Sequence, residues 1–284
     1  MKNRVISGII IGVIALTSIY IGGFYFAAVV TLIALLGSYE FCKTRNRKID
    51  WFEFAIMVIF ILLLNLFYEK AIGLVLLLFI CLMILAIYNE NIDFEDASVS
   101  FAESILLGFA IHEMFSIEVL NKWLFGYIVI IALVTDVFAF FSGKLFGKHK
   151  LNKRISPKKT IEGFIGGWLC GGLISFIYAL ACDFFGLDIS FVVICSIIAP
   201  IFSQIGDLAF SLIKRHYGVK DFSNLIPGHG GILDRFDSLT FTLIIFGAIS
   251  VFLRWRRFYY LAVLDQLANK QLILLKNIKT VYNL

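Results

Sequence analysis

Charged side chains are scarce in this 284-residue sequence, where they make up 16% of the residues, against about 25% in an average soluble domain. Hydrophobic residues make up 60%, and the mean hydropathy is +0.92. That much apolar surface cannot all be buried in a water-soluble core. The apolar residues form long runs and do not alternate with polar ones, which excludes an outer-membrane barrel. The composition therefore predicts an all-α integral membrane protein.

The sequence also lacks the short motifs of zinc and disulfide chemistry. None of its five cysteines forms a Cys-x-x-Cys pair, and no His-Glu-x-x-His motif occurs. Most of the cysteines lie within apolar stretches, where we expect them to be small core residues. Any metal bound by this chain is therefore expected to have oxygen ligands.

Apolar stretches of about the length needed to cross a bilayer, roughly 20 residues, follow one another along the chain. They cover residues 4–22, 23–41, 52–68, 71–88, 98–120, 123–143, 161–182, 189–212 and 238–254. We therefore predict a polytopic bundle of about nine transmembrane helices. No small-x-small cleavage site follows the first stretch, so we interpret it as a retained helix.

Basic residues predict how this bundle is oriented, because cytoplasmic loops collect Lys and Arg. The basic segments are 2–4, 43–48, 143–159 and 214–220. They fall on one side only if stretch 98–120 crosses the membrane despite Glu103, His112 and Glu113. We expect these segments to face the cytoplasm, in a multi-pass protein of the cell inner (cytoplasmic) membrane. Because they adjoin membrane spans, a nucleic-acid partner is not expected.

The two halves of the sequence differ in where their polar residues lie. We predict a transmembrane scaffold bundle over 1–122, a catalytic transmembrane region over 123–254 and an interfacial tail over 255–284. The spans of the first part have few polar interruptions, whereas the second part has Asp136 and Asp207 inside its spans.

Glycine and proline predict local features of the second part. Gly163, Gly167 and Gly171 recur every four residues, which is typical of a close contact between two helices. Pro200 is expected to kink or break the helix that contains it.

Four aspartates form the predicted metal site. A carboxylate inside a span costs about 2.5–3.5 kcal/mol, so Asp136 and Asp207 need a partner, and each alone could simply bond a neighbouring helix. Asp234 and Asp237 are three residues apart and would share one face of a helix. Oxygen-only ligands suit Mg²⁺ or Mn²⁺. We therefore expect Asp207, Asp234 and Asp237 to hold such an ion, with Asp136 as a helper.

Basic residues surround these aspartates in the sequence: Lys158, Lys159, Lys214, Arg215, Lys220 and Arg235. Acidic and basic groups could simply neutralise each other, but a metal ion and phosphate explain the mixture better. The segment "PGHGG" would let backbone amides approach an anion through Gly228, Gly230 and Gly231. The segment "SPKKT" is expected to be a turn before a helix N-terminus. His229 is equally compatible with a structural hydrogen bond and with substrate contact.

The segment 211–237 resembles the signature of the phosphatidate cytidylyltransferases, also called CDP-diacylglycerol synthases. That signature reads S-x-x-K-R-x4-K-D-x5-P-G-H-G-G-x-x-D-R-x-D. The matching positions are Ser211, Lys214, Arg215, Lys220, Asp221, Pro227, Gly228, His229, Gly230, Gly231, Asp234, Arg235 and Asp237. The resemblance covers about 123–250, and the first half matches only as apolar spans.

The resemblance implies transfer of the cytidylyl group of CTP to phosphatidic acid, with CDP-diacylglycerol and pyrophosphate as products. It implies a metal-dependent site at the cytoplasmic face and a homodimer. The expected catalytic residues are Lys214, Arg215, Lys220, Asp221, Arg235 and His229. The expected substrate-binding residues are Lys158, Lys159, Ser211, Gly228, Gly230 and Gly231.

Two other functions fit part of the sequence. A CTP-dependent lipid kinase would share the polar residues but release CDP, whereas the Asp-Gly…Ala-Arg pattern of the CDP-alcohol phosphotransferases is absent. A transporter would explain Asp136, Asp207 and Pro200. However, the sequence shows no internal repeat, and its charge is concentrated in one cytoplasmic cluster.

Overall fold

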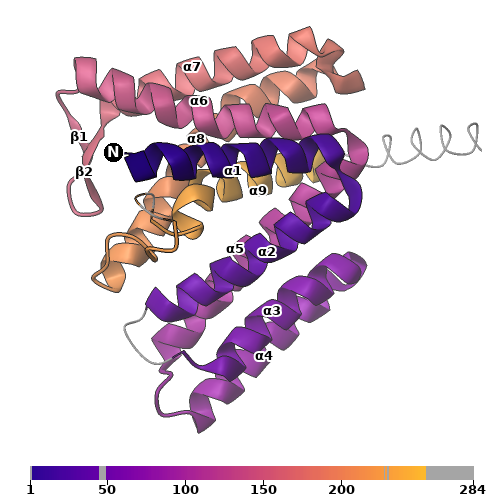
Figure 1. The fold of residues 1–284 in the computed structure, drawn as a ribbon, viewed down its shortest axis with the longest axis vertical. Coiled ribbons are helices and arrows are strands. Elements are labelled where there is room, and N and C mark those ends of the chain that lie inside the picture. The colour runs from indigo at the N-terminus through magenta and orange to yellow at the C-terminus, as the bar shows by residue number, and fades with distance from the viewer. Residues whose placement is uncertain (1, 45–48, 227, 229, 254–284) are drawn as a thin grey trace, which may run out of the picture.

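The computed structural model describes residues 2–44, 49–226, 228 and 230–253, and in these ranges the chain is almost entirely helical (Figure 1). Its α-helices are α1 (Lys2–Ile21), α2 (Gly23–Thr44), α3 (Trp51–Leu66), α4 (Ala71–Tyr88), α5 (Phe94–Leu120), α6 (Lys122–Phe146), α7 (Ile161–Ala181), α8 (Ile189–His216) and α9 (Leu233–Phe252). Each predicted apolar stretch corresponds to one of these helices. The predicted interfacial tail lies outside the described residues.

Six helical segments in the described ranges are long and apolar enough to cross a membrane, which confirms an all-α membrane protein. They are Gly23–Thr44, Tyr68–Tyr88, Lys122–Phe146, Ile161–Ala181, Ile189–His216 and Leu233–Phe252. The number is smaller than the nine predicted spans. One reason is that α3 has only 16 residues, and another is that α5 carries several acidic side chains.

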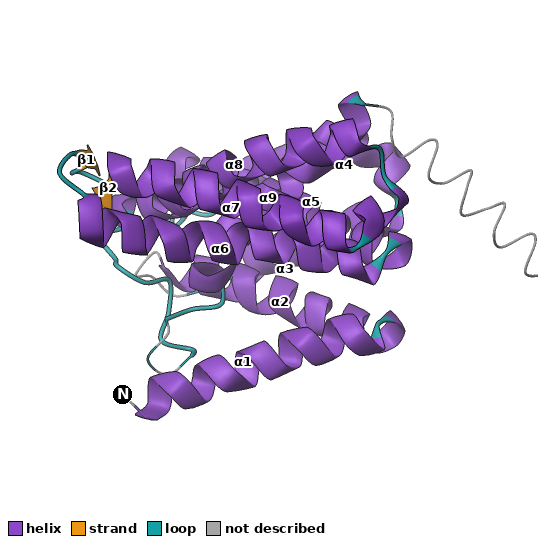
Figure 2. Ribbon diagram, turned by 90° about the horizontal axis from the view of Figure 1, so that it is seen from above, coloured by secondary structure: helices purple, strands orange, loops and turns teal. Residues whose placement is uncertain are grey.

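Helices α6 and α7 lie side by side along their length (Figures 1 and 2). Gly163, Gly167 and Gly171 are all buried on the face of α7 that meets α6. A Cβ atom added at Gly167 would lie 2.7 Å from the carbonyl oxygen of Thr135 and 2.8 Å from the Ala139 side chain. The predicted close contact through these glycines is therefore confirmed.

Helix α8 carries Pro200 in its interior without a break, because the helix runs from Ile189 to His216. Of the two predicted effects, a break at this proline is therefore excluded, and a kink stays a prediction. At the other end of this segment, α9 begins at Leu233 and not at residue 238. As a result, the end of the 211–237 motif forms the first turns of α9.

Side chains cap several of the helices and fix where they begin. Thr160 precedes α7, and its hydroxyl oxygen accepts a hydrogen bond from the N–H of Gly163. Asp188 precedes α8 in the same way and accepts hydrogen bonds from the hydroxyl and the N–H of Ser190. These hydrogen bonds stabilise the charged carboxylate and lower the pKa of Asp188 below its usual value.

Two strands form a small hairpin between α6 and α7. Strand β1 (Lys150–Asn152) pairs in antiparallel fashion with β2 (Ser156–Thr160). The prediction that "SPKKT" is a turn was therefore wrong, because these residues form β2. Both strands of a two-stranded sheet are edge strands, so Pro157 can occupy one despite lacking an N–H group.

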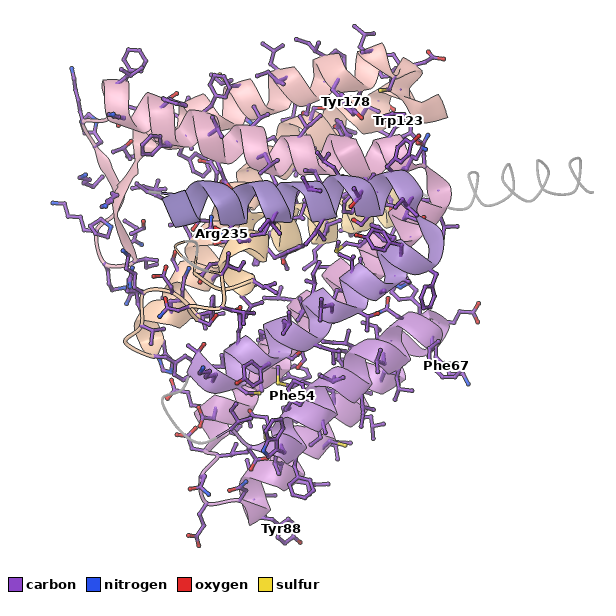
Figure 3. All side chains as sticks on the ribbon, viewed as in Figure 1. Phe54, Phe67, Tyr88, Trp123, Tyr178 and Arg235 are labelled. Carbon is purple, nitrogen blue, oxygen red and sulfur yellow. The ribbon has the colours of Figure 1, made fainter. Side chains whose placement is uncertain are left out.

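The hairpin marks one end of the molecule, which we call the hairpin end. Figure 1 shows that the N-terminus, the β-hairpin and the segment between α8 and α9 all lie at this end. The turn between α5 and α6 lies at the opposite end, where Figure 3 labels Trp123. The fold thus gathers the N-terminus and both large basic segments at one end, as the charge pattern predicts.

Candidate active site

Acidic residues from three helices meet at the hairpin end. Asp136 comes from α6, Asp207 from the second half of α8, and Asp237 from the second turn of α9. Arg235, also on α9, lies at the same end (Figure 3) and is exposed. Three of the predicted metal ligands are therefore brought to the same end from positions that are about 100 residues apart in the sequence.

Ser238 joins Asp136 to Asp237. Its hydroxyl donates a hydrogen bond to Oδ2 of Asp136 at 2.9 Å. Its backbone N–H donates to Oδ1 of Asp237 at 2.8 Å. Because Ser238 is buried, it holds the two carboxylates in a fixed relation between α6 and α9. This serine lies directly after the motif in the sequence, and its residue type alone does not mark it as part of a site.

Asp207 lies beside Lys159 of β2. The Nζ atom of Lys159 is 2.6 Å from Oδ2 of Asp207, and both side chains are between a quarter and a third exposed. Ser211 donates a weaker hydrogen bond to Oδ1 of Asp207 at 3.4 Å. This partly exposed ion pair attaches the hairpin to α8 at the edge of the site.

Arg215 makes a second connection between α8 and the hairpin. Its Nε donates a hydrogen bond to the carbonyl of Ile155 at 3.3 Å, and another guanidinium nitrogen donates to the carbonyl of Val219 at 2.9 Å. The side chain remains exposed. Its charge is not matched by a carboxylate in these two contacts and is available to an anion.

Lys214 and Asp234 form a buried ion pair. Nζ of Lys214 lies 2.6 Å from Oδ1 of Asp234, and the two side chains are 8% and 3% exposed. Oδ2 of Asp234 accepts hydrogen bonds from the N–H groups of Phe222 and Gly231, both at 2.9 Å. Both carboxylate oxygens are therefore used within the protein. Asp234 faces the last turn of α8 and not Asp136 and Asp207, so this geometry does not favour its predicted role as a metal ligand, which stays a prediction.

Glu40 of α2 also reaches this end and is not among the site residues predicted from the sequence. Its carboxylate accepts hydrogen bonds from the Ser223 hydroxyl at 2.6 Å and from the N–H groups of Ile232 and Leu233 at 2.9 and 3.0 Å. The side chain is completely buried. The one available signal was an acidic residue inside the predicted apolar span 23–41, which is unusual in a membrane segment.

The glycine-rich turn before α9 has the expected special backbone. Gly228 and Gly230 have φ angles of +78° and +83°, which a residue with a Cβ atom rarely adopts. The N–H of Gly231 is bonded to Asp234, and those of the next two residues are bonded to Glu40. The amide of Gly231 therefore already has a partner within the protein, and its contact with a substrate anion stays a prediction. The predicted residue His229, like Pro227, lies outside the described residues.

Exposed cations remain at this end for an anionic ligand. Lys158 on β2 and Lys220 before the glycine-rich turn are both exposed, as is the neighbouring Asp221. Lys159 and Arg215, whose partners are described above, and the exposed Arg235 bring further basic side chains to the same end. This arrangement can bind a polyanion such as a nucleoside triphosphate.

The metal site predicted from the sequence stays a prediction. In the described ranges, no three His, Cys, Asp or Glu side chains are grouped so as to hold a metal ion. The chemistry of the donors nevertheless suits a hard cation, because Asp136, Asp207 and Asp237 offer carboxylate oxygen atoms from three neighbouring helices.

The chain is similar to known proteins over most of its length. Residues 2–253 match the model of the Cytidylyltransferase family. A protein of Staphylococcus haemolyticus (strain JCSC1435) named phosphatidate cytidylyltransferase is 34% identical over 256 residues, which cover 86% of this chain and 96% of the relative. A Bacillus subtilis (strain 168) protein of the same name is 29% identical over 256 residues, with 86% and 95% covered.

Proposed function

This chain belongs to the cytidylyltransferase family, and we propose that it transfers the cytidylyl group of CTP to phosphatidic acid, forming CDP-diacylglycerol and pyrophosphate in phospholipid biosynthesis. Relatives named phosphatidate cytidylyltransferase match this chain over 86% of its length. The observation that carries the proposal is the meeting of carboxylates and basic residues at one end of an otherwise apolar helical protein. A reaction between a membrane lipid and a soluble nucleotide requires such a combination.

The acceptor needs little activation. Phosphatidic acid is a phosphate monoester, whose second pKa is about 6 by analogy with phosphorylated side chains, so its oxygen is already a nucleophile at neutral pH. This oxygen attacks the α-phosphorus of CTP, and the bond to the oxygen bridging to the β-phosphate breaks. Pyrophosphate leaves with the electron pair of that bond. The task of the protein is therefore to align two polyanions and to neutralise their charge.

The basic residues of the hairpin end supply this charge. Lys159 and Arg215 flank the carboxylates of the site, and Lys158, Lys220 and Arg235 extend the positive charge around them. Ser211 supports Asp207. Lys214 acts indirectly, because its charge is matched by Asp234 inside the protein. The proposed role of Asp221 rests on the motif alone.

We propose Mg²⁺ or Mn²⁺ as the cofactor, held by Asp207 and Asp237 with Asp136 as a helper. When bound, such an ion would neutralise phosphate charge and stabilise the leaving pyrophosphate. Ser238 would keep Asp136 and Asp237 oriented toward the ion, because it hydrogen-bonds both. The proposal assigns no ligand role to Asp234.

We further propose a bundle of about nine spans in the inner (cytoplasmic) membrane, with the hairpin end facing the cytoplasm, where CTP is present. The support is the common location of the basic segments at that end (Figure 1). A homodimer is also proposed, on the resemblance alone.

The test uses purified full-length protein in lipid with phosphatidic acid, CTP and Mg²⁺. CDP-diacylglycerol and pyrophosphate should form in equal amounts, and EDTA should abolish both. Diacylglycerol should not replace phosphatidic acid, because its hydroxyl has a far higher pKa and needs a base. Phosphorylation of diacylglycerol with release of CDP would instead identify a lipid kinase and refute the proposal.

A further inference from the structure

Glu40 connects the apolar first half of the chain to the motif segment at the hairpin end. Its carboxylate is completely buried, and its partners are one hydroxyl and two backbone N–H groups, from Ser223, Ile232 and Leu233. These donors lie 183 to 193 residues later in the sequence. Helix α2 therefore contributes a buried negative charge to the point at which α9 begins.

We propose that Glu40 is a positioning residue for the reaction, which fixes the first turn of α9 and the glycine-rich turn before it. This inference rests on the proposed function. The carboxylate of Glu40 is hydrogen-bonded to Ser223, Ile232 and Leu233, which are not among the predicted substrate-binding residues. It acts through α9, which carries Asp237 and Ser238 into the site.

The start of α9 explains why a carboxylate from another helix is needed. The residue at the N-cap position is Ile232, whose side chain cannot accept a hydrogen bond, and no side-chain cap is formed there. The first N–H groups of a helix need acceptors, and negative charge near them is stabilised by the helix dipole. Glu40 provides the acceptor oxygen atoms and the negative charge. Its three hydrogen-bond donors in turn offset the free-energy cost of burying that charge.

Gly231 supports the same assignment. A Cβ atom at this position would lie 2.5 Å from Oε2 of Glu40 and 2.8 Å from Oε1. Such contacts are closer than van der Waals distance, so a side chain here would displace the carboxylate. The last glycine of the "PGHGG" segment thus leaves room for Glu40, and not for an incoming anion.

The position of α9 matters because the proposed metal ligands come from different helices. Asp237 lies one turn beyond the residues that Glu40 holds, and Ser238 links it to Asp136 of α6. A shift of α9 would separate Asp237 from Asp136 and Asp207. Displacements of about 1 Å can reduce a reaction rate about 10²-fold, so loss of Glu40 should reduce turnover more than CTP binding.

The test compares Glu40→Gln with Glu53→Gln in the full-length protein. Glu53 is a matched control, since it is a buried carboxylate of α3 that accepts a hydrogen bond from Ser100 and lies outside the proposed site. In Glu40→Gln, the amide group of Gln would place N–H donors against the N–H groups of α9. We expect kcat to fall about 10- to 100-fold with the KM for CTP changed less than about threefold, and Glu53→Gln to stay within about threefold of wild type.

Hydrogen–deuterium exchange supplies a readout that does not depend on activity. Peptides covering 222–236 should exchange faster in Glu40→Gln than in wild type, whereas Glu53→Gln should leave them unchanged. In a Ser238→Ala background, Glu40→Gln should lower kcat by a smaller factor than it does in the wild-type protein, because both changes misplace Asp237. If Glu40→Gln does not accumulate, Ser223→Ala removes one donor and should give smaller effects in the same direction.

The outcomes separate this inference from the proposed function. Wild-type kcat and unchanged exchange in Glu40→Gln, or in Ser223→Ala if that variant is used, would overturn the positioning role. The role would also be overturned if kcat fell equally in Glu40→Gln and Glu53→Gln and each fall paralleled a fall in the midpoint of thermal unfolding. If wild-type protein forms no CDP-diacylglycerol, the proposed function fails, and the exchange data still decide whether Glu40 positions α9.

Discussion

Lys214 and Asp234 show that a motif residue can serve the site without facing it. Their ion pair joins the last turn of α8 to the first turn of α9, with the glycine-rich segment between them. Asp234 also accepts hydrogen bonds from the backbone N–H groups of Phe222 and Gly231, which lie between the two helices. In the motif, the lysine stands 20 residues before the aspartate, and their ion pair holds together the two ends of the loop between them.

Removing one member of this pair should destabilise the protein. Asp234→Asn leaves the buried ammonium group of Lys214 without a counter-charge, and breaking such pairs typically costs about 3–5 kcal/mol. We expect a clear fall in the midpoint of thermal unfolding in detergent. The double variant Lys214→Met/Asp234→Asn should recover part of the lost stability.

The control is Lys220→Met, which removes an exposed lysine and should change the free energy of unfolding by no more than about 0.5 kcal/mol. Equal midpoints for Asp234→Asn and Lys220→Met would contradict a buried pair.

Asp207 should instead affect activity with little change in stability. Asp207→Asn keeps the shape of a partly exposed side chain but removes the charge that pairs with Lys159 and that we propose holds the metal ion. We expect kcat/KM to fall about 100-fold or more, while folded protein still accumulates. Turnover should rise again as Mg²⁺ is increased.

The control for this experiment is Asp188→Asn, which changes an exposed aspartate outside the site. It should remain as active as wild type. Near-normal turnover of Asp207→Asn at ordinary Mg²⁺ concentrations would remove Asp207 from the proposed ligand set.

The sequence predicted which residue types form the site better than it predicted their partners. Asp207 and Asp136 could be selected because a carboxylate inside an apolar span needs an explanation. Asp234 was grouped with them because three-residue spacing places it on the same helix as Asp237, but that spacing does not say which neighbour each one faces. Glu40 is also a carboxylate inside a predicted span, but its donors are one serine hydroxyl and two backbone N–H groups, which the sequence does not distinguish.

At the scale of helices, the apolar runs predicted α1 to α9 with small errors at their ends. A bilayer-length run needs no partner to be recognised, since its length and composition alone define it. The strands of the hairpin could not be predicted in the same way, because "SPKKT" becomes a strand only by pairing with residues 150–152. The separation of a scaffold over 1–122 from a catalytic region over 123–254 stays a prediction, although Glu40 connects the two parts.

The contact between α6 and α7 gives a prediction at this scale. Gly167→Ala would place a methyl group 2.7 Å from the carbonyl oxygen of Thr135, which forces the helices apart. Such overpacking typically costs about 1–3 kcal/mol, so the midpoint of thermal unfolding should fall. Gly73→Ala is the matched control on α4, because nothing lies within 4 Å of its added Cβ atom. A Gly167→Ala midpoint at or above that of Gly73→Ala would show that the contact is less close than described.

For the whole molecule, the location of the basic segments predicts the orientation in the membrane. In a cysteine-free background, Lys150→Cys at the hairpin should react with a membrane-impermeant reagent only from the cytoplasmic side. Lys122→Cys changes the first residue of α6, at the opposite end, and should react only from outside. Labelling of position 150 from outside would invert the proposed topology and separate the site from cytoplasmic CTP.

The hydrogen bonds of Glu40 also impose an order on how the protein is made. The donors lie 183 to 193 residues downstream, and at about 5–20 residues per second the ribosome needs roughly 10–40 s to reach them. During that interval, α2 carries an acid whose final partners do not yet exist. The carboxylate of α2 can therefore be fully bonded only when α9 is present, and the end of the molecule where we propose that CTP binds is completed last. A translation product that stops before Gly231 contains most of the helices but lacks the two backbone N–H groups that would bind this carboxylate.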